Sequence, residues 1–165
     1  MELIKSGAKR VYFTEKNIST LNHTEKSIRN KCKDFSEIMG KCSFHTLDWH
    51  SCVPIDLEID KGQSYILLSD CFYDKYDFEN VIYVIYWFAK NFVKSRILVC
   101  QEIRCPDWSL EPILEIWNLR SVFLKKYNDN FYIYEFIIKH YSFSHLTKLF
   151  INAPMKQNIV KFILI

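Results

Sequence analysis

Two apolar runs stand out in the alternation of hydrophobic and polar positions along the chain, residues 64–69 (SYILLS) and 96–101 (RILVCQ). Nearly unbroken apolar runs of this length are typical of strands that are covered on both faces, as in a parallel sheet. Between them, hydrophobic residues recur at helical spacing from Phe78 to Phe92, which predicts a helix with one buried face. The order of strand, helix and strand predicts a parallel βαβ unit.

Shorter patterns continue the same alternation on both sides of this unit. The expected elements are a strand at 10–14, a helix at 19–32, a strand at 42–49, a helix at 108–117, and strands at 121–124 and 131–138. Pro112 falls within the last helix, where it is tolerated only in the first turn. Strands that alternate with helices predict an α/β fold with a doubly wound, mostly parallel sheet, which the last two strands finish as an antiparallel hairpin.

Polar side chains follow three of the predicted strands. Glu15 comes directly after the first strand, Asp48 and Trp49 close the second, and Asp70 follows the third. Each acid alone is explained more simply as a helix cap or a turn residue. Because the carboxyl ends of parallel strands meet at one edge of a sheet, where ligands bind, three acids at successive strand ends predict a ligand site.

Composition and charge narrow the class of protein. With 165 residues, 49% of them hydrophobic, the chain is expected to form a single domain with its own core. Its 22 basic and 19 acidic residues give a net charge of +3 and are spread along the chain, which gives no direct sign of a nucleic-acid partner. The beginning of the chain lacks the apolar stretch of a signal peptide, and no run is long enough to span a membrane. We therefore expect an intracellular protein without a membrane partner.

One group of side chains has the composition of a metal site: Cys42, His45, His50 and Cys52. Its spacing is not that of a zinc finger, and the segment is better explained as a strand and its exit loop. We therefore expect no metal site.

Several stretches resemble the seven-strand, S-adenosylmethionine-dependent methyltransferases of the lysine-methyltransferase-like group. The most specific is QEIRCPDWSLEPILEIW (101–117), in which a glutamine and an arginine precede Asp-Trp-Ser-Leu-Glu and a helix that ends in tryptophan. The stretch SDCFYDKYDFENVIYVIYW (69–87) is similar to the exit of the fourth strand and the helix that follows it, and it contains the Asp-x-x-Tyr motif of the group. The similarity extends from about Lys5 to Leu124, which implies a partial methyltransferase domain over 1–140 and a divergent tail over 141–165.

The resemblance implies that S-adenosylmethionine binds at the predicted edge of the sheet. Glu15 would accept hydrogen bonds from the ribose hydroxyls, as acids at this position do in dinucleotide-binding sheets. Trp49 would offer an aromatic face to adenine, and Asp48 would accept a hydrogen bond from its amino group. Ser69 would also contact the cofactor.

The resemblance further implies that Asp70 and Tyr73 act in catalysis, facing the methyl donor and the incoming nitrogen. For Tyr73, a half-buried aromatic residue without a catalytic role is an equally good interpretation. Past the next strand, the residues implied to contact the substrate are Arg104, Asp107, Trp108 and Glu111. The implied substrate is a protein arginine, with a histone as partner in the cytoplasm and nucleus, although the residues themselves do not favour arginine over lysine.

The chain departs from the family at its beginning, where the first strand and the glycine-rich cofactor loop would precede Lys5. We therefore expect a Rossmann-like sheet of the class I methyltransferase type that lacks this strand and loop. Because the missing strand is central, its neighbours are expected to remain unpaired. The alternative to a methyltransferase is an interaction module that keeps the fold and has no catalytic activity.

Overall fold

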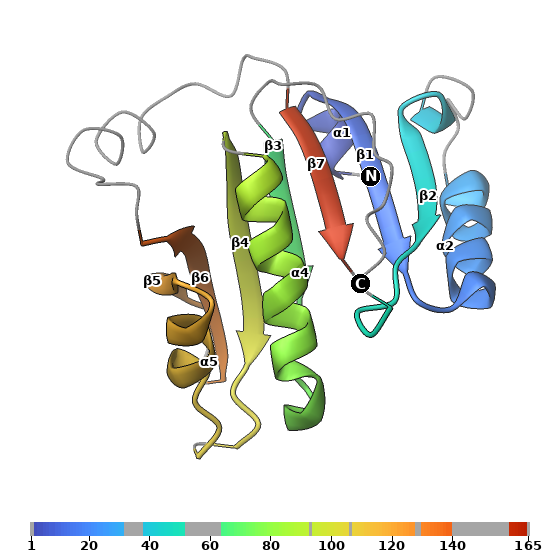
Figure 1. Ribbon diagram of the computed structural model, residues 1–165. Coiled ribbons are helices and arrows are strands. Elements are labelled where there is room, and N and C mark those ends of the chain that lie inside the picture. Colours follow the sequence, from blue (N-terminus) through green and yellow to red (C-terminus); the bar gives the residue numbers. More distant parts are fainter. Residues whose placement is uncertain are drawn as a thin grey trace.

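The computed structural model describes residues 2–31, 38–51, 64–92, 94–105, 107–127, 130–139 and 159–164. Its strands form one seven-stranded sheet in the order β2-β1-β7-β3-β4-β6-β5 (Figure 1). The strands are β1 (Ala8–Glu15), β2 (Cys42–Thr46), β3 (Ser64–Ser69), β4 (Ser95–Glu102), β5 (Leu119–Lys126), β6 (Phe131–Ile138) and β7 (Ile159–Leu164). The neighbours from β2 to β4 are parallel, whereas β6 is antiparallel to both β4 and β5. The predicted α/β fold with a mostly parallel sheet and a final hairpin is confirmed.

Helices lie against the sheet and bury it on both faces. They are α1 (Glu2–Lys5), α2 (Ile18–Lys31), the short 3-10 helix η1 (Lys75–Asp77), α4 (Phe78–Asn91) and α5 (Glu111–Ile116). In Figure 1, α4 and α5 lie in front of the sheet, and α2 lies beside β2. Strand β1 contributes to two cores: Tyr12 belongs to the main cluster with α4, while Val11 and Phe13 pack with Leu21 of α2. Side chains of a strand alternate between faces, so this division shows that β1 is covered on both.

Most of the predicted elements have close counterparts in the structure. Strands β3 and β6 have the bounds that their apolar patterns predict, and α4 begins and ends within one residue of the predicted helix. The predicted helix at 108–117 is longer than α5, which begins only at Glu111. Proline lacks the N–H that a residue inside a helix donates to the preceding turn. A helix that contains Pro112 therefore has Pro112 in its first turn, and α5 begins one residue before it.

Strand β7 contradicts the expectation that the neighbours of the missing first strand remain unpaired. It lies between β1 and β3 and is parallel to both, with Lys161 opposite Val11 on one side and Phe162 opposite Ile66 on the other. The place that the family resemblance assigns to the first strand is thus taken by the last described segment of the chain (Figure 1). The division between 1–140 and the tail 141–165 stays a prediction about sequence similarity, and residues 140–158 lie outside the described part.

Candidate functional site

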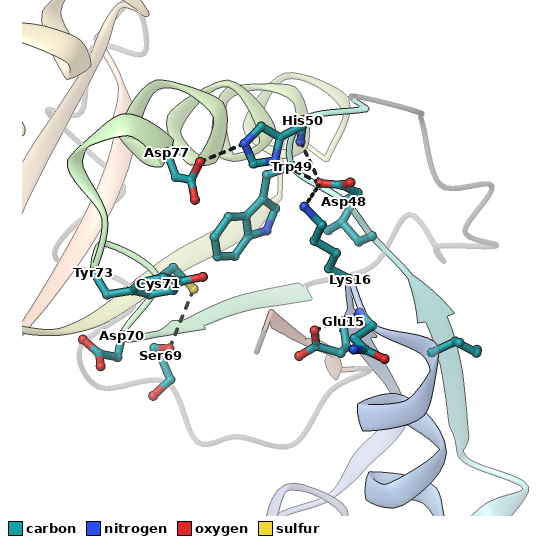
Figure 2. A pocket seen from close by; sticks show the side chains of 13 residues that line it. Glu15, Lys16, Asp48, Trp49, His50, Ser69, Asp70, Cys71, Tyr73 and Asp77 are labelled. Atoms are coloured by element: carbon teal, nitrogen blue, oxygen red, sulfur yellow. Dashed lines mark hydrogen bonds and ion pairs between the residues drawn. The ribbon is translucent and has the colours of Figure 1, made fainter.

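A cavity of about 670 Å³ opens where β1, β2 and β3 end (Figure 2). Because these strands run in the same direction, their carboxyl ends meet at this edge of the sheet, as the sequence predicts. Six of the predicted site residues line the cavity: Glu15, Asp48, Trp49, Ser69, Asp70 and Tyr73. The structure therefore brings together the residues proposed for the cofactor and those proposed for catalysis, while their roles stay predictions.

Glu15 is held at the end of β1 by the start of α2. Its Oε1 accepts a hydrogen bond from the backbone N–H of Asn17 at 3.0 Å, and its carbonyl oxygen accepts one from Leu47 N–H at 3.0 Å. Asn17 in turn accepts a hydrogen bond from Ser19 N–H through Oδ1 at 2.8 Å, the usual arrangement of an N-cap. These contacts fix the carboxylate on the side of the cavity that faces β2.

The segment after β2 forms a second wall of the cavity. Asp48 accepts the backbone N–H of His50 at 3.0 Å, and its Oδ1 lies 3.4 Å from Nζ of Lys16. Hydrogen bonding by the His50 backbone, supported by the His50 ring and Lys16, holds the pKa of the Asp48 carboxyl below its usual value. Trp49 points into the cavity between these groups and Tyr73, with 6.4 Å between the two ring centroids (Figure 2).

His50 connects this wall to the start of α4. Its Nδ1 lies 3.1 Å from Oδ1 of Asp48, and its Nε2 lies 2.8 Å from Oδ1 of Asp77. A neutral imidazole has one N–H, so both contacts are hydrogen bonds only when the ring is protonated. Either way, His50 bridges two carboxylates on opposite sides of Trp49.

Asp70 occupies a constrained position at the end of β3. Its φ angle is 53°, in the left-handed region that aspartate adopts more readily than most residues, and its N–H donates to Cys100 O of β4 at 2.8 Å. Arg104 forms an ion pair with its Oδ2. Among the described residues, none donates a hydrogen bond to the buried Oδ1. An unsatisfied buried acceptor costs about 1–3 kcal/mol, so this arrangement of the Asp70 carboxylate lowers the stability of the fold.

The four residues predicted to contact the substrate do not line the cavity. Arg104 contacts Asp70 at its edge, and Asp107 is exposed. Trp108 packs edge-on against Phe78 with 5.7 Å between ring centroids, and Glu111 accepts a hydrogen bond from Ser121 at 2.8 Å. For Trp108 and Glu111, these contacts offer a structural explanation beside the functional one.

Seven further residues line the cavity and were not predicted as site residues: Lys16, Asn17, Ile18, Leu47, His50, Cys71 and Asp77. Most of them are sequence neighbours of residues that were predicted. The exception is Asp77, which precedes α4 and lies four residues from Tyr73. Its contact with His50 depends on the folded arrangement of two loops and has no local signal in the sequence.

The lining residues fit the adenosine part of S-adenosylmethionine. A carboxylate for the ribose, an aromatic ring and a second carboxylate converge from neighbouring strand ends. The sequence has three widely spaced glycines, Gly7, Gly40 and Gly62, and the lining residues would hold the adenosine part of the cofactor.

The described part of the chain holds no group of three or more side chains that could bind a metal ion, and Cys52 of the candidate metal cluster lies outside this part. In the same residues, no helix is both long enough and apolar enough to cross a membrane.

Comparison with known proteins gives a partial match to methyltransferases. No family model matches the chain. A 60-residue stretch, 36% of the chain, is 35% identical to histone-arginine methyltransferase METTL23 of Homo sapiens and to that of Rattus norvegicus, and 33% identical to that of Mus musculus. The matches cover 32%, 27% and 24% of these relatives, so the similar stretch spans between a quarter and a third of their length. The resemblance to methyltransferases is thus confirmed over about a third of the chain, and the α/β sheet is consistent with their Rossmann-like fold.

Proposed function

We propose that the cavity binds S-adenosylmethionine and that the protein transfers its methyl group to a side-chain nitrogen of a protein substrate. The observation that carries this proposal is the convergence of Glu15, Trp49 and Asp70 in one cavity, where they follow β1, β2 and β3. Its volume, about 670 Å³, lies within the usual range for small-molecule sites. The partial similarity to METTL23 supports the same activity.

The adenosine moiety is proposed to lie between β1 and β2. Glu15 would accept hydrogen bonds from the ribose hydroxyls. Its carboxylate is already held in place by the hydrogen bond that Asn17 N–H donates to Oε1. Trp49 would pack against the adenine ring, and Asp48 would accept a hydrogen bond from the adenine amino group. Ser69 is the last residue of β3 and lines the cavity next to Asp70.

The transfer is proposed to take place at the other side of the cavity, where Figure 2 shows Asp70 and Tyr73 across from Glu15. When bound, S-adenosylmethionine supplies an electrophilic methyl group. The protein must hold the acceptor nitrogen in line and exclude water, and such positioning provides most of the catalysis. Asp70 would orient the acceptor through an N–H, and Tyr73 would place its hydroxyl in the same space.

The acceptor is proposed to be arginine, as the name of the histone-arginine methyltransferase relatives suggests, or lysine. A guanidinium keeps its proton at neutral pH because its pKa lies above about 12, so this proton must leave with or after the methyl transfer. A histone is the proposed partner, with the cytoplasm and nucleus as the proposed location.

A second candidate is an interaction module that binds adenosine-like ligands without transferring a methyl group. The lining residues would serve the binding of adenosine equally well without a methyl transfer, which is the reason to keep this candidate. Binding and transfer must therefore be measured separately.

Calorimetry with S-adenosylhomocysteine tests the binding part of the proposal. We expect binding to the wild-type chain and a loss of about tenfold or more in Glu15→Gln, with no change in the surface variant Glu25→Gln. Transfer of a labelled methyl group to histones and to arginine or lysine peptides then tests the reaction. Binding without transfer would favour the interaction module, and no binding at millimolar concentration would contradict both.

A further inference from the structure

Strand β5 forms one edge of the sheet. It is the last strand in the order, it pairs with β6 on one side, and no strand among the described residues pairs with its other side (Figure 1). The backbone N–H and C=O groups that point outward from an edge strand can form hydrogen bonds with another strand. Along the eight residues of β5 (Leu119–Lys126), these groups provide a place for one more strand of the sheet.

The two edges of the sheet differ in length and exposure. Strand β2, at the opposite edge, has five residues, of which only Thr46 is exposed. In β5, five of the eight residues are exposed, namely Arg120, Phe123, Leu124, Lys125 and Lys126. Two of these side chains are large and apolar, since Phe123 is 57% and Leu124 is 42% exposed. An exposed edge that carries apolar side chains favours pairing with another chain.

The contacts of β5 show which of its side chains share a face. Ser121 donates a hydrogen bond to Glu111 of α5, so Ser121 and Phe123 lie on the face toward α5. Phe123 is opposite Tyr134 of β6, with 6.1 Å between the ring centroids. An added strand would therefore place every second side chain beside an exposed aromatic ring.

The other face of β5 is basic. Arg120 is opposite Ile137, and Lys125 is opposite Ile133. Both isoleucines are an odd number of positions from Tyr134 in β6, so they and the two cations belong to the face away from α5. Within the described part of the chain, neither Arg120 nor Lys125 forms an ion pair with a carboxylate. Their charges are thus available to a strand that pairs with β5.

The charge of β5 decides which kind of strand fits the edge. Two copies of this chain joined through β5 would place Arg120 and Lys125 of one copy near the same residues of the other, and like charges on neighbouring strands are destabilising. A basic peptide such as a histone tail meets the same repulsion. A segment with acidic side chains at alternate positions instead places carboxylates beside the two cations and its remaining side chains beside Phe123.

We propose that β5 binds an extended, acidic segment of a partner protein as an additional strand of the sheet. Carboxylates of this segment lie beside Arg120 and Lys125, and apolar side chains between them pack against Phe123. Strands β4 and β6 separate β5 from β3, which places the partner about 14 Å from the strand that leads to Asp70. The surface is separate from the proposed cofactor site, so the proposal does not depend on the transfer of a methyl group.

Short synthetic peptides test the proposal. The probe is an acidic peptide in which glutamate and valine alternate. One control has lysine in place of glutamate, and the other is the acidic peptide with a methyl group on every backbone nitrogen, which keeps the charge and removes the N–H donors. We expect the acidic peptide to bind at least about tenfold more tightly than either control in fluorescence polarisation. The amides of β5 that point away from β6 should exchange more slowly in the complex.

Charge reversal tests the role of the two cations. Arg120→Glu/Lys125→Glu should weaken binding of the acidic peptide by about tenfold or more and allow the lysine peptide to bind. The matched control is Lys26→Glu/Lys94→Glu, which makes the same change in net charge on α2 and before β4 and should change little. All four positions are exposed, so both variants are expected to fold, which thermal unfolding verifies.

Equal binding of the methylated peptide would overturn the proposal, because attraction between charges alone would then explain the affinity. Failure of the acidic peptide to bind at millimolar concentration would overturn it as well. A concentration-dependent dimer in which the outward amides of β5 are protected would make a second copy of the chain the occupant instead. Tighter binding of a uridine oligonucleotide, lost in Arg120→Glu/Lys125→Glu, would assign the surface to nucleic acid.

Discussion

His50 and Asp77 join two segments that are distant in the sequence, with 2.8 Å between Nε2 of the imidazole and Oδ1 of the carboxylate. Trp49 lies directly before His50, and its neighbour Asp48 contacts the same imidazole through Oδ1. The bridge therefore holds the wall that presents Trp49 to the cavity. Asp77 makes no side-chain hydrogen bond that caps α4, which allows the bridge to be removed without removing a helix cap.

We predict that Asp77→Ala loosens the segment after β2. Hydrogen exchange of the amides of His50 and Ser51, both bonded to Asp48, should accelerate about tenfold, which corresponds to about 1.4 kcal/mol of local stability. If Trp49 packs against adenine, the affinity for S-adenosylhomocysteine should fall as well. His23→Gln, on the exposed side of α2, is the control. Unchanged exchange in Asp77→Ala would show that the contact does not hold the wall.

Strand β7 leads to a prediction about the stability of the whole sheet. It pairs with β1 and β3 at once, and Ile163 lies opposite Phe13 and Leu67, so an N–H lost there disrupts a ladder inside the sheet. We predict that Ile163→Pro destabilises the protein more than Ile163→Ala, because alanine shortens the side chain but keeps the backbone N–H. Urea unfolding and light scattering measure stability and aggregation. Equal effects of the two variants would argue against backbone pairing in this place.

The sequence was sufficient to predict most of the elements from β1 to β6 and the edge at which the cavity lies. The apolar runs of β3 and β4 and the helical spacing in α4 are local patterns, and parallel pairing then brings Glu15, Asp48 and Asp70 to one edge. The position of β7 could not be predicted in the same way. Its apolar sequence is compatible with a strand, but its place between β1 and β3 depends on pairing between distant parts of the chain.

Two contacts of the site show the same limit at the level of side chains. Arg104 reaches Asp70 because β3 and β4 are in register, with Ser69 opposite Cys100, and only this alignment brings the two segments together. His50 meets Asp77 through loops that no periodic pattern describes. Local sequence patterns can therefore identify candidate site residues, whereas the side chains that these residues contact depend on the tertiary fold.

Arg96 and Glu135 test stability far from the cavity, at the beginning of β4. Nε and Nη2 of Arg96 donate to the two carboxylate oxygens of Glu135, each at 2.8 Å, and the side chains are only 27% and 15% exposed. We predict that Arg96→Met lowers the free energy of unfolding by about 2 kcal/mol, because it leaves a largely buried carboxylate unpaired. Urea unfolding measures the change.

The control for this pair is the exposed ion pair of Arg29 and Glu25 on α2. Arg29→Met should change the free energy of unfolding by no more than about 0.5 kcal/mol, as is usual for solvent-exposed pairs. Ligand binding should be unaffected in both variants. A loss in Arg29→Met as large as that in Arg96→Met would show that burial does not set the strength of these pairs.

Cys71 contributes a thiol to the lining of the cavity, and its environment argues against a role as a nucleophile. The thiol is buried, which raises its pKa to about 12, and it donates weakly to Ser69 O at 3.7 Å. At pH 8 the thiolate fraction is then about one in ten thousand, compared with roughly a quarter for an ordinary thiol. A covalent step through Cys71 would have to proceed from this minute fraction.

We therefore predict that iodoacetamide modifies Cys71 in the native protein at pH 8 roughly a thousandfold more slowly than it modifies an ordinary exposed thiol. Between pH 8 and pH 9 the rate at Cys71 should rise about tenfold, because the thiolate fraction increases tenfold per unit as long as the pH stays well below the pKa. Mass spectrometry of peptides resolves Cys71 from the partly exposed Cys105, which serves as the internal comparison. Fast modification of Cys71 at pH 8 would mean that its thiol is ionised in the cavity. Direct transfer of the methyl group from the cofactor to the substrate nitrogen would then compete with a covalent step through Cys71.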